Sequence, residues 1–276
     1  MIIIGIEVHK DWIKELFIEK AHLFLRLLNA MWRTSEEESM YVAKLLSTLG
    51  LGKESKILDL GCGNGRIAIN LAKHGYKVVG VDISPILIED ALKKAKEHKV
   101  TDRVKFLVGD ALKIPEVLRD EVFDATIMYW TTIIGYYLSK DIDIEILRNI
   151  KKVTKDQGYL LILNTVSLDL VALRSSLCRV EGVVNEIDEE YMLIEKPRFD
   201  PKTSIVENTW LFYRKEGKNL KYIDEISFRL KVYTLHELVE IAEKAGWRFV
   251  NAYQDLVTLR PYKPGLSSLN VVFKNI

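Results

Sequence analysis

Three glycines and one distant aspartate are the residues of this chain whose spacing most clearly suggests chemistry. Gly61, Gly63 and Gly65 follow an apolar run ending at Leu60, and Asp82 ends a second apolar run, about 20 residues further on. Glycines let a ligand approach the backbone, and a helix that begins directly after them presents free N–H groups to it. An acidic side chain at that separation reaches a pair of ribose hydroxyls. The spacing therefore predicts a site for an adenosine-type ligand.

The sixth position of the glycine loop helps to distinguish between adenosine ligands. A dinucleotide fingerprint has glycine there, whereas this chain has Arg66, which disfavours NAD. The segment 59–65 reads Asp-Leu-Gly-Cys-Gly-Asn-Gly and resembles the first motif, D/E-x-G-x-G-x-G, of the class I S-adenosylmethionine-dependent methyltransferases. The resemblance implies that S-adenosylmethionine is the cofactor, and that Asp59 orients either the loop or the amino group of the ligand.

The elements that must position these residues alternate between strands and helices. Apolar runs at 77–81, 104–109, 123–129 and 159–164 indicate strands, and Ser84-Pro85 caps and opens a helix. Right-handed crossovers then give a parallel sheet. The resemblance extends over residues 55–165 and implies an α/β fold with a Rossmann-like seven-stranded methyltransferase sheet. One departure is Asp-Gln-Gly at 156–158, where the family often has Pro-Gly-Gly before the fifth strand.

The resemblance assigns further cofactor contacts. Asp110 would accept a hydrogen bond from the adenine amino group and the backbone N–H of Ala111 would meet the ring, although a helix cap is the alternative role for Asp110. Ile83 and Tyr129 are expected among the same contacts. Tyr129 and Trp130, just past the fourth strand, are expected beside the methyl group, where aromatic faces would favour a cation; packing is the alternative for them. Tyr136, on the next loop, is a candidate substrate contact.

Segments outside the core are expected to cover the site. Residues 10–33 have apolar side chains at helical spacing and a second helix is predicted over 35–49. Trp32 and Arg33, at the end of the first helix, are candidate cofactor contacts, whereas the other aromatics of that helix are expected to be core. Alternating runs between 166 and 230 predict an antiparallel meander, in which Arg229 is a candidate substrate contact, with a surface ion pair as the alternative.

These patterns divide the chain into three parts. An N-terminal helical cap spans 1–50, the methyltransferase core spans 51–165 and 231–276, and a lid or substrate insertion spans 166–230. A helix capped by Thr234 and a final strand pair at 247–253 and 269–273 are expected to complete the core.

Composition narrows the choice of partner and compartment. The 276 residues have a formal net charge of +1, which does not favour a grip on nucleic acid. Cys62 and Cys178 form no C-x-x-C pair, and the five histidines lack metal spacing, so no metal is expected. No signal peptide or membrane span is read from the sequence, which predicts a cytoplasmic protein. Two glutamines among many Lys, Glu and Ile residues suggest a thermophilic source.

The sequence favours a small-molecule acceptor, methylated at nitrogen by in-line transfer. A dedicated base is optional for an amine, whereas a hydroxyl or carbon acid usually needs one. An RNA or protein methyltransferase and a non-catalytic S-adenosylmethionine-binding protein are the alternatives that remain. The acceptor itself and the oligomeric state are not determined at this level.

Overall fold

A seven-stranded sheet forms the centre of this computed structural model, which describes residues 12–130, 133–177 and 182–276. The strand order is β10-β11-β5-β4-β1-β2-β3. The parallel strands are β1 (Lys56–Leu60), β2 (Lys77–Asp82), β3 (Val104–Val108), β4 (Phe123–Tyr129) and β5 (Thr154–Thr165). β11 (Leu269–Asn275) lies antiparallel to both β5 and β10 (Trp247–Tyr253). The predicted fold class is confirmed.

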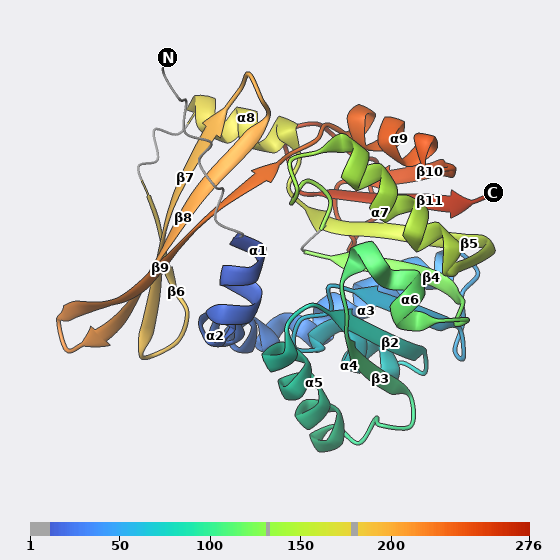
Figure 1. Ribbon diagram of the computed structural model, residues 1–276, viewed down its shortest axis with the longest axis horizontal. Coiled ribbons are helices and arrows are strands. Elements are labelled where there is room, and N and C mark those ends of the chain that lie inside the picture. The colour runs from blue at the N-terminus through green and yellow to red at the C-terminus, as the bar shows by residue number, and fades with distance from the viewer. Residues whose placement is uncertain (1–11, 131–132, 178–181) are drawn as a thin grey trace, which may run out of the picture.

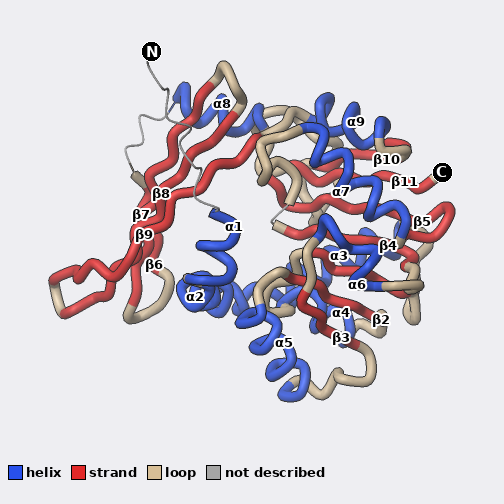
Figure 2. Tube along the Cα trace, in the orientation of Figure 1, coloured by secondary structure: helices blue, strands red, loops and turns tan. Residues whose placement is uncertain are grey.

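Helices cover both faces of this sheet (Figures 1 and 2). One face carries α3 (Ser35–Thr48), α4 (Arg66–Lys73) and α5 (Pro85–Glu97). The other carries the 3-10 turn η3 (Ala111–Lys113), α6 (Ile114–Leu118), α7 (Lys140–Lys152) and α9 (Leu235–Lys244). The order of the strands reverses between β1 and β4, and ligands of open α/β sheets bind at such a switch point, outside the carboxyl ends of the strands.

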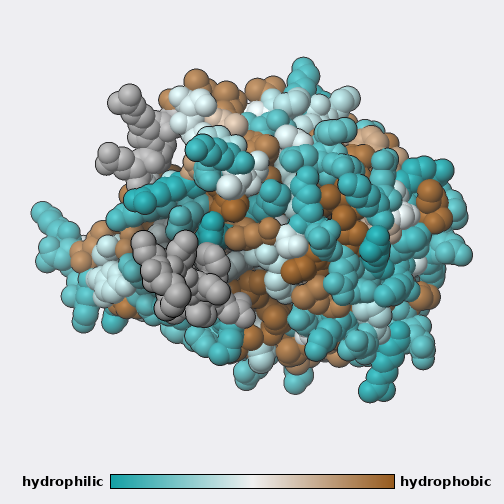
Figure 3. Space-filling view, turned by 45° about the horizontal axis from the view of Figure 1, so that its top comes forward, coloured by the Kyte–Doolittle hydropathy of each residue, from teal (hydrophilic) through white to brown (hydrophobic). Residues whose placement is uncertain are grey.

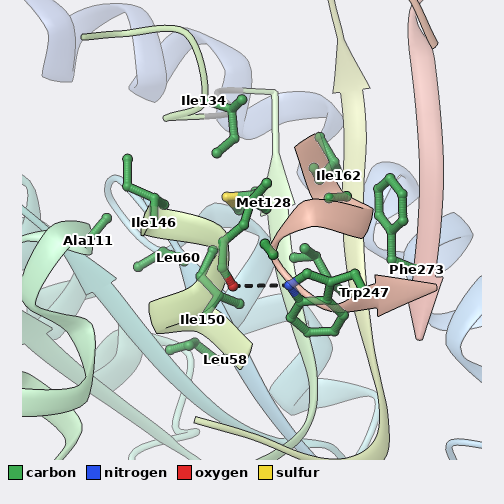
Figure 4. Packing of buried hydrophobic residues seen from close by; sticks show 14 of the residues in the cluster. Leu58, Leu60, Ala111, Met128, Ile134, Ile146, Ile150, Ile162, Trp247 and Phe273 are labelled. Atoms are coloured by element: carbon green, nitrogen blue, oxygen red, sulfur yellow. Dashed lines mark hydrogen bonds between the residues drawn. The ribbon is translucent and has the colours of Figure 1, made fainter. Parts of the chain in front are cut away.

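Apolar packing between the sheet and α7 and α9 fixes the second layer. Trp247 is buried and its indole Nε1 donates to the carbonyl oxygen of Leu147 at 3.0 Å (Figure 4). Leu58, Leu60 and Met128 from β1 and β4 belong to the same cluster. Thr234 begins α9 with a capping box in which its side chain and that of Glu237 each bond the other's backbone. These contacts hold β1 and β4, the two strands at the switch point, against a rigid layer.

The N-terminal segment is broken where one helix was expected. It contains α1 (Trp12–Lys14), the π-turn η1 (Glu15–Glu19), α2 (Ala21–Met31) and the 3-10 turn η2 (Trp32–Thr34). The break is at Lys20, whose N–H bonds the carbonyl oxygen of Glu15 at 2.8 Å. Its Nζ lies 2.8 Å from Asp224 and 2.9 Å from Glu15. The ion pair with Asp224 of the distant strand β9 (Asn219–Lys231) thus favours a break at Lys20. The periodicity of the N-terminal sequence does not reveal such a tertiary contact.

A separate four-stranded antiparallel sheet confirms the predicted meander. It follows α8 (Leu168–Leu177) and has the order β6-β7-β8-β9. Its strands are β6 (Val183–Glu186), β7 (Tyr191–Asp200), β8 (Ile205–Glu216) and β9 (Asn219–Lys231). Figure 1 shows this sheet beside the main one, with α1 and α2 between them. The assignment of these parts as cap, core and lid stays a prediction.

The helix α2 is tied to both sheets. Asn29 accepts a hydrogen bond from Asn64 of the glycine loop at 2.9 Å. Arg26 pairs with Asp188 of the second sheet region at 2.9 Å and stacks over the ring of Tyr191 at 3.5 Å. The helix therefore contacts both the glycine loop of the main sheet and the region of the antiparallel sheet.

The face shown in Figure 3 is largely hydrophilic, with smaller groups of hydrophobic residues among the hydrophilic ones. Within the described ranges, none of the helices combines the length and apolar character that crossing a bilayer requires.

Candidate active site

A cavity lies at the carboxyl ends of β1, β2, β3 and β4. The glycine loop and Asp82 form part of its wall, and Phe17, Phe24 and Leu28 of the N-terminal segment form another part. Of the predicted glycine and acid positions, Asp59, Gly61, Gly63, Asp82 and Asp110 line this cavity at the switch point, whereas Gly65 does not.

The glycine loop is shaped by its neighbours in the protein. Gly61, Gly63 and Gly65 have φ angles of +75°, +55° and +78°, a region that side chains disfavour. A Cβ on Gly63 would lie 2.9 Å from Leu28 Cδ1, and one on Gly65 would lie 2.6 Å from Phe106 Cζ. At these two positions the space is taken by packing side chains, a reason for glycine that the motif alone did not reveal.

Asp82 holds this loop against the end of β2. One carboxylate oxygen accepts from the Gly63 N–H at 2.9 Å, and the other accepts from the Ser84 N–H at 2.9 Å. Burial raises the pKa of Asp82 to about 6, against the lowering effect of these backbone donors. The Ile83 N–H is a third backbone donor to this carboxylate, and because a carboxylate has about four lone-pair sites, one acceptor site is left.

Asp59 is the buried acid at the centre of the site. Burial raises the pKa of Asp59 to about 7; the charge of nearby Asp82 adds to this, while Arg66 and the Ala68 N–H oppose it. Its Oδ2 atom is buried and has no hydrogen-bond partner among the described residues. Because buried polar atoms are usually paired, this oxygen indicates a ligand donor at the cavity wall.

Arg66, Glu38 and Tyr129 form a network that sequence reasoning missed. Arg66 forms an ion pair with Glu38 of α3, and its guanidinium lies 5.2 Å from the centroid of the Tyr129 ring. Burial, with the charge of Glu38, raises the pKa of Tyr129, which also hydrogen-bonds to Glu38 and Asn164. The sequence offered one sign of this network, which is a charged residue, Arg66, at the start of a predicted helix. In the structure the Arg66 side chain is buried.

Asp110, Ala111 and Ile83 also line the cavity. Asp110 caps the following turn, because its Oδ1 accepts from the Leu112 N–H at 2.9 Å. The cap that was considered as its alternative role is therefore present. Its predicted contact with adenine, like the predicted roles of Ala111 and Ile83, stays a prediction.

Aromatic side chains form the wall opposite the glycine loop. Trp130 and Tyr136 line the cavity, as do Phe17 and Phe24. Phe24 stacks on Trp130 with ring centroids 6.2 Å apart, and Phe17 stacks on Tyr136 at 6.2 Å. Trp130 has a φ of +68°, a strained conformation for a bulky residue that is common at functional sites. Phe17 and Phe24 were expected to be core; both are buried, and both also reach this cavity.

The side chains of three residues that were expected to contact the cofactor or the substrate lie elsewhere. Trp32 is absent from the cavity wall and stacks on His98 at 5.7 Å. Arg33 is exposed and borders a different hollow. Arg229 lies opposite Glu207 in the β8–β9 register, on the face opposite that of Asn208 and Phe228, and lines neither space. Helix rotation and strand alternation decide these directions. Cys178 lies outside the described residues.

A second, larger hollow adjoins the cavity. It is open to solvent, has a volume of about 3,740 Å³, and lies between α2, α8 and one face of the antiparallel sheet. Trp130 lines both spaces. Trp210 of β8 faces the hollow and stacks on Phe24 with ring centroids 6.2 Å apart. The aromatic wall is thus shared between the cavity and the hollow.

Comparison with known proteins agrees with this architecture. A family model described as a methyltransferase domain matches residues 51–223. YqeM of Bacillus subtilis is 32% identical over 111 residues, which are 40% of this chain and 42% of that protein. The chain thus aligns with less than half the length of this curated relative.

Solved structures resemble more of the chain. The CcbJ methyltransferase from Streptomyces caelestis has a TM-score of 0.71 and 20% identity, over 88% of this chain and 89% of its own. The sugar N-methyltransferase KedS8 from Streptoalloteichus sp. has a TM-score of 0.63 and 16% identity, over 86% of each chain. At these identities the likeness concerns the fold. Because the domain model covers more than half of the chain, including the glycine loop and Asp82, this protein belongs to the class I S-adenosylmethionine-dependent methyltransferases.

Proposed function

We propose that the protein transfers the methyl group of S-adenosylmethionine to an amine nitrogen of a small molecule. The observation that carries the proposal is the junction of two spaces at Trp130. The cavity beside the glycine loop is lined by the acidic residues predicted to bind the cofactor, and the hollow under the antiparallel sheet opens onto the same aromatic side chain. One space suits the cofactor and the other suits the acceptor.

The residues of the cavity fit S-adenosylmethionine. The unpaired Oδ2 of Asp59 suits the cationic α-amino group, and Asp82 suits the ribose hydroxyls. Asp110 and the Ala111 N–H would hold the adenine, with Ile83 and Tyr129 completing the wall. When bound, S-adenosylmethionine supplies an electrophilic methyl group on a sulfonium sulfur.

The chain itself contributes positioning and exclusion of water. Trp130, Tyr136 and Phe24 form an apolar wall, and enclosure strengthens every electrostatic interaction inside. Holding two reactants in line is worth about 7–11 kcal/mol of the barrier when the geometry is right. The α2 helix, tied to Asn64 on one side and Asp188 on the other, keeps Phe24 in place between cofactor space and acceptor space.

Nitrogen is the acceptor atom that this lining favours. An amine becomes cationic as it is methylated, and aromatic faces stabilise a cation by about 0.5–2 kcal/mol. A hydroxyl would instead have to give its proton to a base. The described lining contains no histidine, and the raised pKa of Tyr129 reflects an environment that disfavours its anionic form. The carboxylates of the lining, Asp59, Asp82 and Asp110, are assigned here to the cofactor.

A small acceptor fits the charge distribution and the fold. The net charge of +1 gives no general attraction for a polyanion. The structural match to a sugar N-methyltransferase covers 86% of this chain. The uncovered part is shorter than the segment 166–230, so the match includes at least part of that segment. That relative acts on a sugar nitrogen by its name, and here its likeness supports the proposal at the level of architecture.

Transfer of labelled methyl groups tests the proposal. The purified chain is incubated with methyl-labelled S-adenosylmethionine in three separate reactions, which contain amine-containing metabolites, transfer RNA or protein extracts. We expect label in a low-molecular-weight product, with the new methyl on nitrogen by NMR. Label only in RNA or protein would contradict the proposal, and cofactor binding without any labelled product would indicate a non-catalytic binding protein.

A further inference from the structure

Glu195 forms an anionic centre on the face of the lid sheet that borders the hollow. Its Oε1 accepts from Asn185 Nδ2 at 2.7 Å, and its Oε2 accepts from Asn208 Nδ2 at 2.9 Å and from Trp210 Nε1 at 3.0 Å. Glu195 pairs with Trp210 across β7 and β8, so both side chains project from the same face. Three donors on separate residues fix the carboxylate in one orientation.

The charge of Glu195 has no counterion in the described parts of the chain. Arg33, Arg174, Arg198 and Lys215 border the same hollow. The three arginines are exposed, Lys215 pairs with Glu186 at 3.4 Å, and none of the four forms an ion pair with this carboxylate. All three of its donors are neutral groups. An ionised carboxylate has about four lone-pair sites, so one site and the full negative charge are left for a ligand.

Asn208 adds a second acceptor beside it. The residue is only 8% exposed and lines the hollow. Because its amide nitrogen donates to Glu195, the orientation of the amide is set. Its Oδ1 is buried and has no hydrogen-bond partner among the described residues, a rare condition that calls for an explanation. A carboxylate and an unpaired carbonyl oxygen at one place match a group that donates several hydrogen bonds and carries positive charge.

The acidic centre lies along the aromatic wall that leads from the cofactor cavity. Trp210, which donates to Glu195, stacks on Phe24, and Phe24 stacks on Trp130. Phe228 lies against Trp210 with ring centroids 5.0 Å apart. The wall is therefore continuous from Trp130 to the carboxylate, and an extended acceptor could contact both ends of it.

We infer that Glu195 and Asn208 form a second acceptor subsite that binds a protonated amine, remote from the nitrogen that receives the methyl group. The acceptor is then a molecule with two amino groups: a neutral one at Trp130 and a cationic one at Glu195. The inference rests on the proposed function for the first of these groups. The second follows from the lid alone.

Binding of matched amines tests the subsite. Ligand-observed NMR titrations of the full chain, with and without S-adenosylhomocysteine, compare α,ω-diaminoalkanes of increasing length with uncharged α,ω-alkanediols of the same lengths. We expect the wild type to prefer the diamine at one favoured length by roughly tenfold or more, the worth of a charge-assisted hydrogen bond. Equal affinities for diamines and diols at every length would overturn the inference.

Three variants separate recognition of charge from structural support. Glu195→Gln removes the charge and should abolish the diamine preference. Glu207→Gln makes the same change on β8, on the exposed opposite face, and should keep it. Asn185→Ala removes one donor to Glu195 but leaves the charge, and should also keep most of the preference. Loss of the preference in Asn185→Ala or Glu207→Gln as large as in Glu195→Gln would show a structural role and contradict the subsite.

This measurement does not depend on catalysis. If no amine is methylated but Glu195→Gln still loses the diamine preference, the proposed function fails and the subsite stands. If methylated amines are found that bind equally well to wild type and Glu195→Gln, the proposed function stands and the subsite fails.

Discussion

The affinity for S-adenosylhomocysteine should depend on pH through Asp59. In the ligand-free protein, burial raises the pKa of this carboxyl to about 7. The amino group of the ligand is a cation and binds the ionised form, so binding releases a proton from the acid form. With that pKa, about nine in ten carboxyls are ionised at pH 8 and about one in ten at pH 6. The Kd should therefore weaken about tenfold on acidification, or about 1.4 kcal/mol.

Calorimetric titration between pH 6 and 8 measures this effect, with buffers of different ionisation enthalpy to count the proton. Asp59→Asn should bind more weakly and lose most of the pH dependence in this range, leaving at most about a twofold effect from Asp82, whose pKa burial raises to about 6. Asp124→Asn is the matched control, because Asp124 lies near the start of β4, whereas the cavity is at the carboxyl end of that strand. The pKa of Asp124 is lowered by Lys155 and the Lys56 N–H despite burial. A flat wild-type profile, or an Asp59→Asn profile with the wild-type slope, would refute the reasoning.

Thermal stability gives an independent check of the same sign. A carboxyl whose folded pKa lies above its unfolded value of 3.8 stabilises the fold at low pH, and this stability is lost as pH rises through about 7. A bound cation beside Asp59 offsets that loss. The ligand should therefore raise Tm more at pH 8 than at pH 6.

Other expectations concern packing, the acceptor and salt. Gly65→Ala should lower the free energy of unfolding, measured with urea, by about 2–4 kcal/mol, because its Cβ would meet Phe106 at 2.6 Å and the left-handed backbone adds about 1 kcal/mol. Gly50→Ala is the control: Gly50 has a φ of +82° and open space around it, so this variant should lose only the backbone contribution of about 1 kcal/mol. Trp130→Ala should weaken acceptor binding by about 0.5–2 kcal/mol and raise KM, while Trp130→Phe retains most of it. Affinity for the acceptor should change little with salt, whereas an RNA acceptor would show a steep fall of log K against log salt.

The central sheet could be predicted because each strand announces itself locally. The runs that became β1 to β5 are apolar and separated by helices with clear starts, such as Ser84-Pro85. The edge strand β6 was missed, because Val183–Glu186 has exposed valines and lacks a buried face. Its existence depends on pairing with β7, and a four-residue exposed run carries too little pattern to reveal this.

Site residues were predictable where a motif fixes the backbone and not where tertiary packing fixes the side chain. The loop glycines and Asp82 follow from spacing along two adjacent strands. The Arg66–Glu38 pair joins helices 28 residues apart in sequence, so neither residue signals the other. Trp32 and Arg33 point elsewhere because the segment breaks at Lys20 and tightens into a 3-10 turn at 32–34, which changes the rotation of every following side chain.

The aromatic wall also has a consequence for biosynthesis. Its members Phe24, Trp130 and Trp210 come from the beginning, middle and last third of the chain. During translation the first domain elements emerge and fold before the later ones, at about 5–20 residues per second. A nascent chain can thus assemble the glycine loop and its strands well before the antiparallel sheet leaves the ribosome. Until β8 has emerged, Phe24 lacks the Trp210 ring that packs against it, and such transiently exposed apolar surface makes a growing polypeptide prone to aggregation.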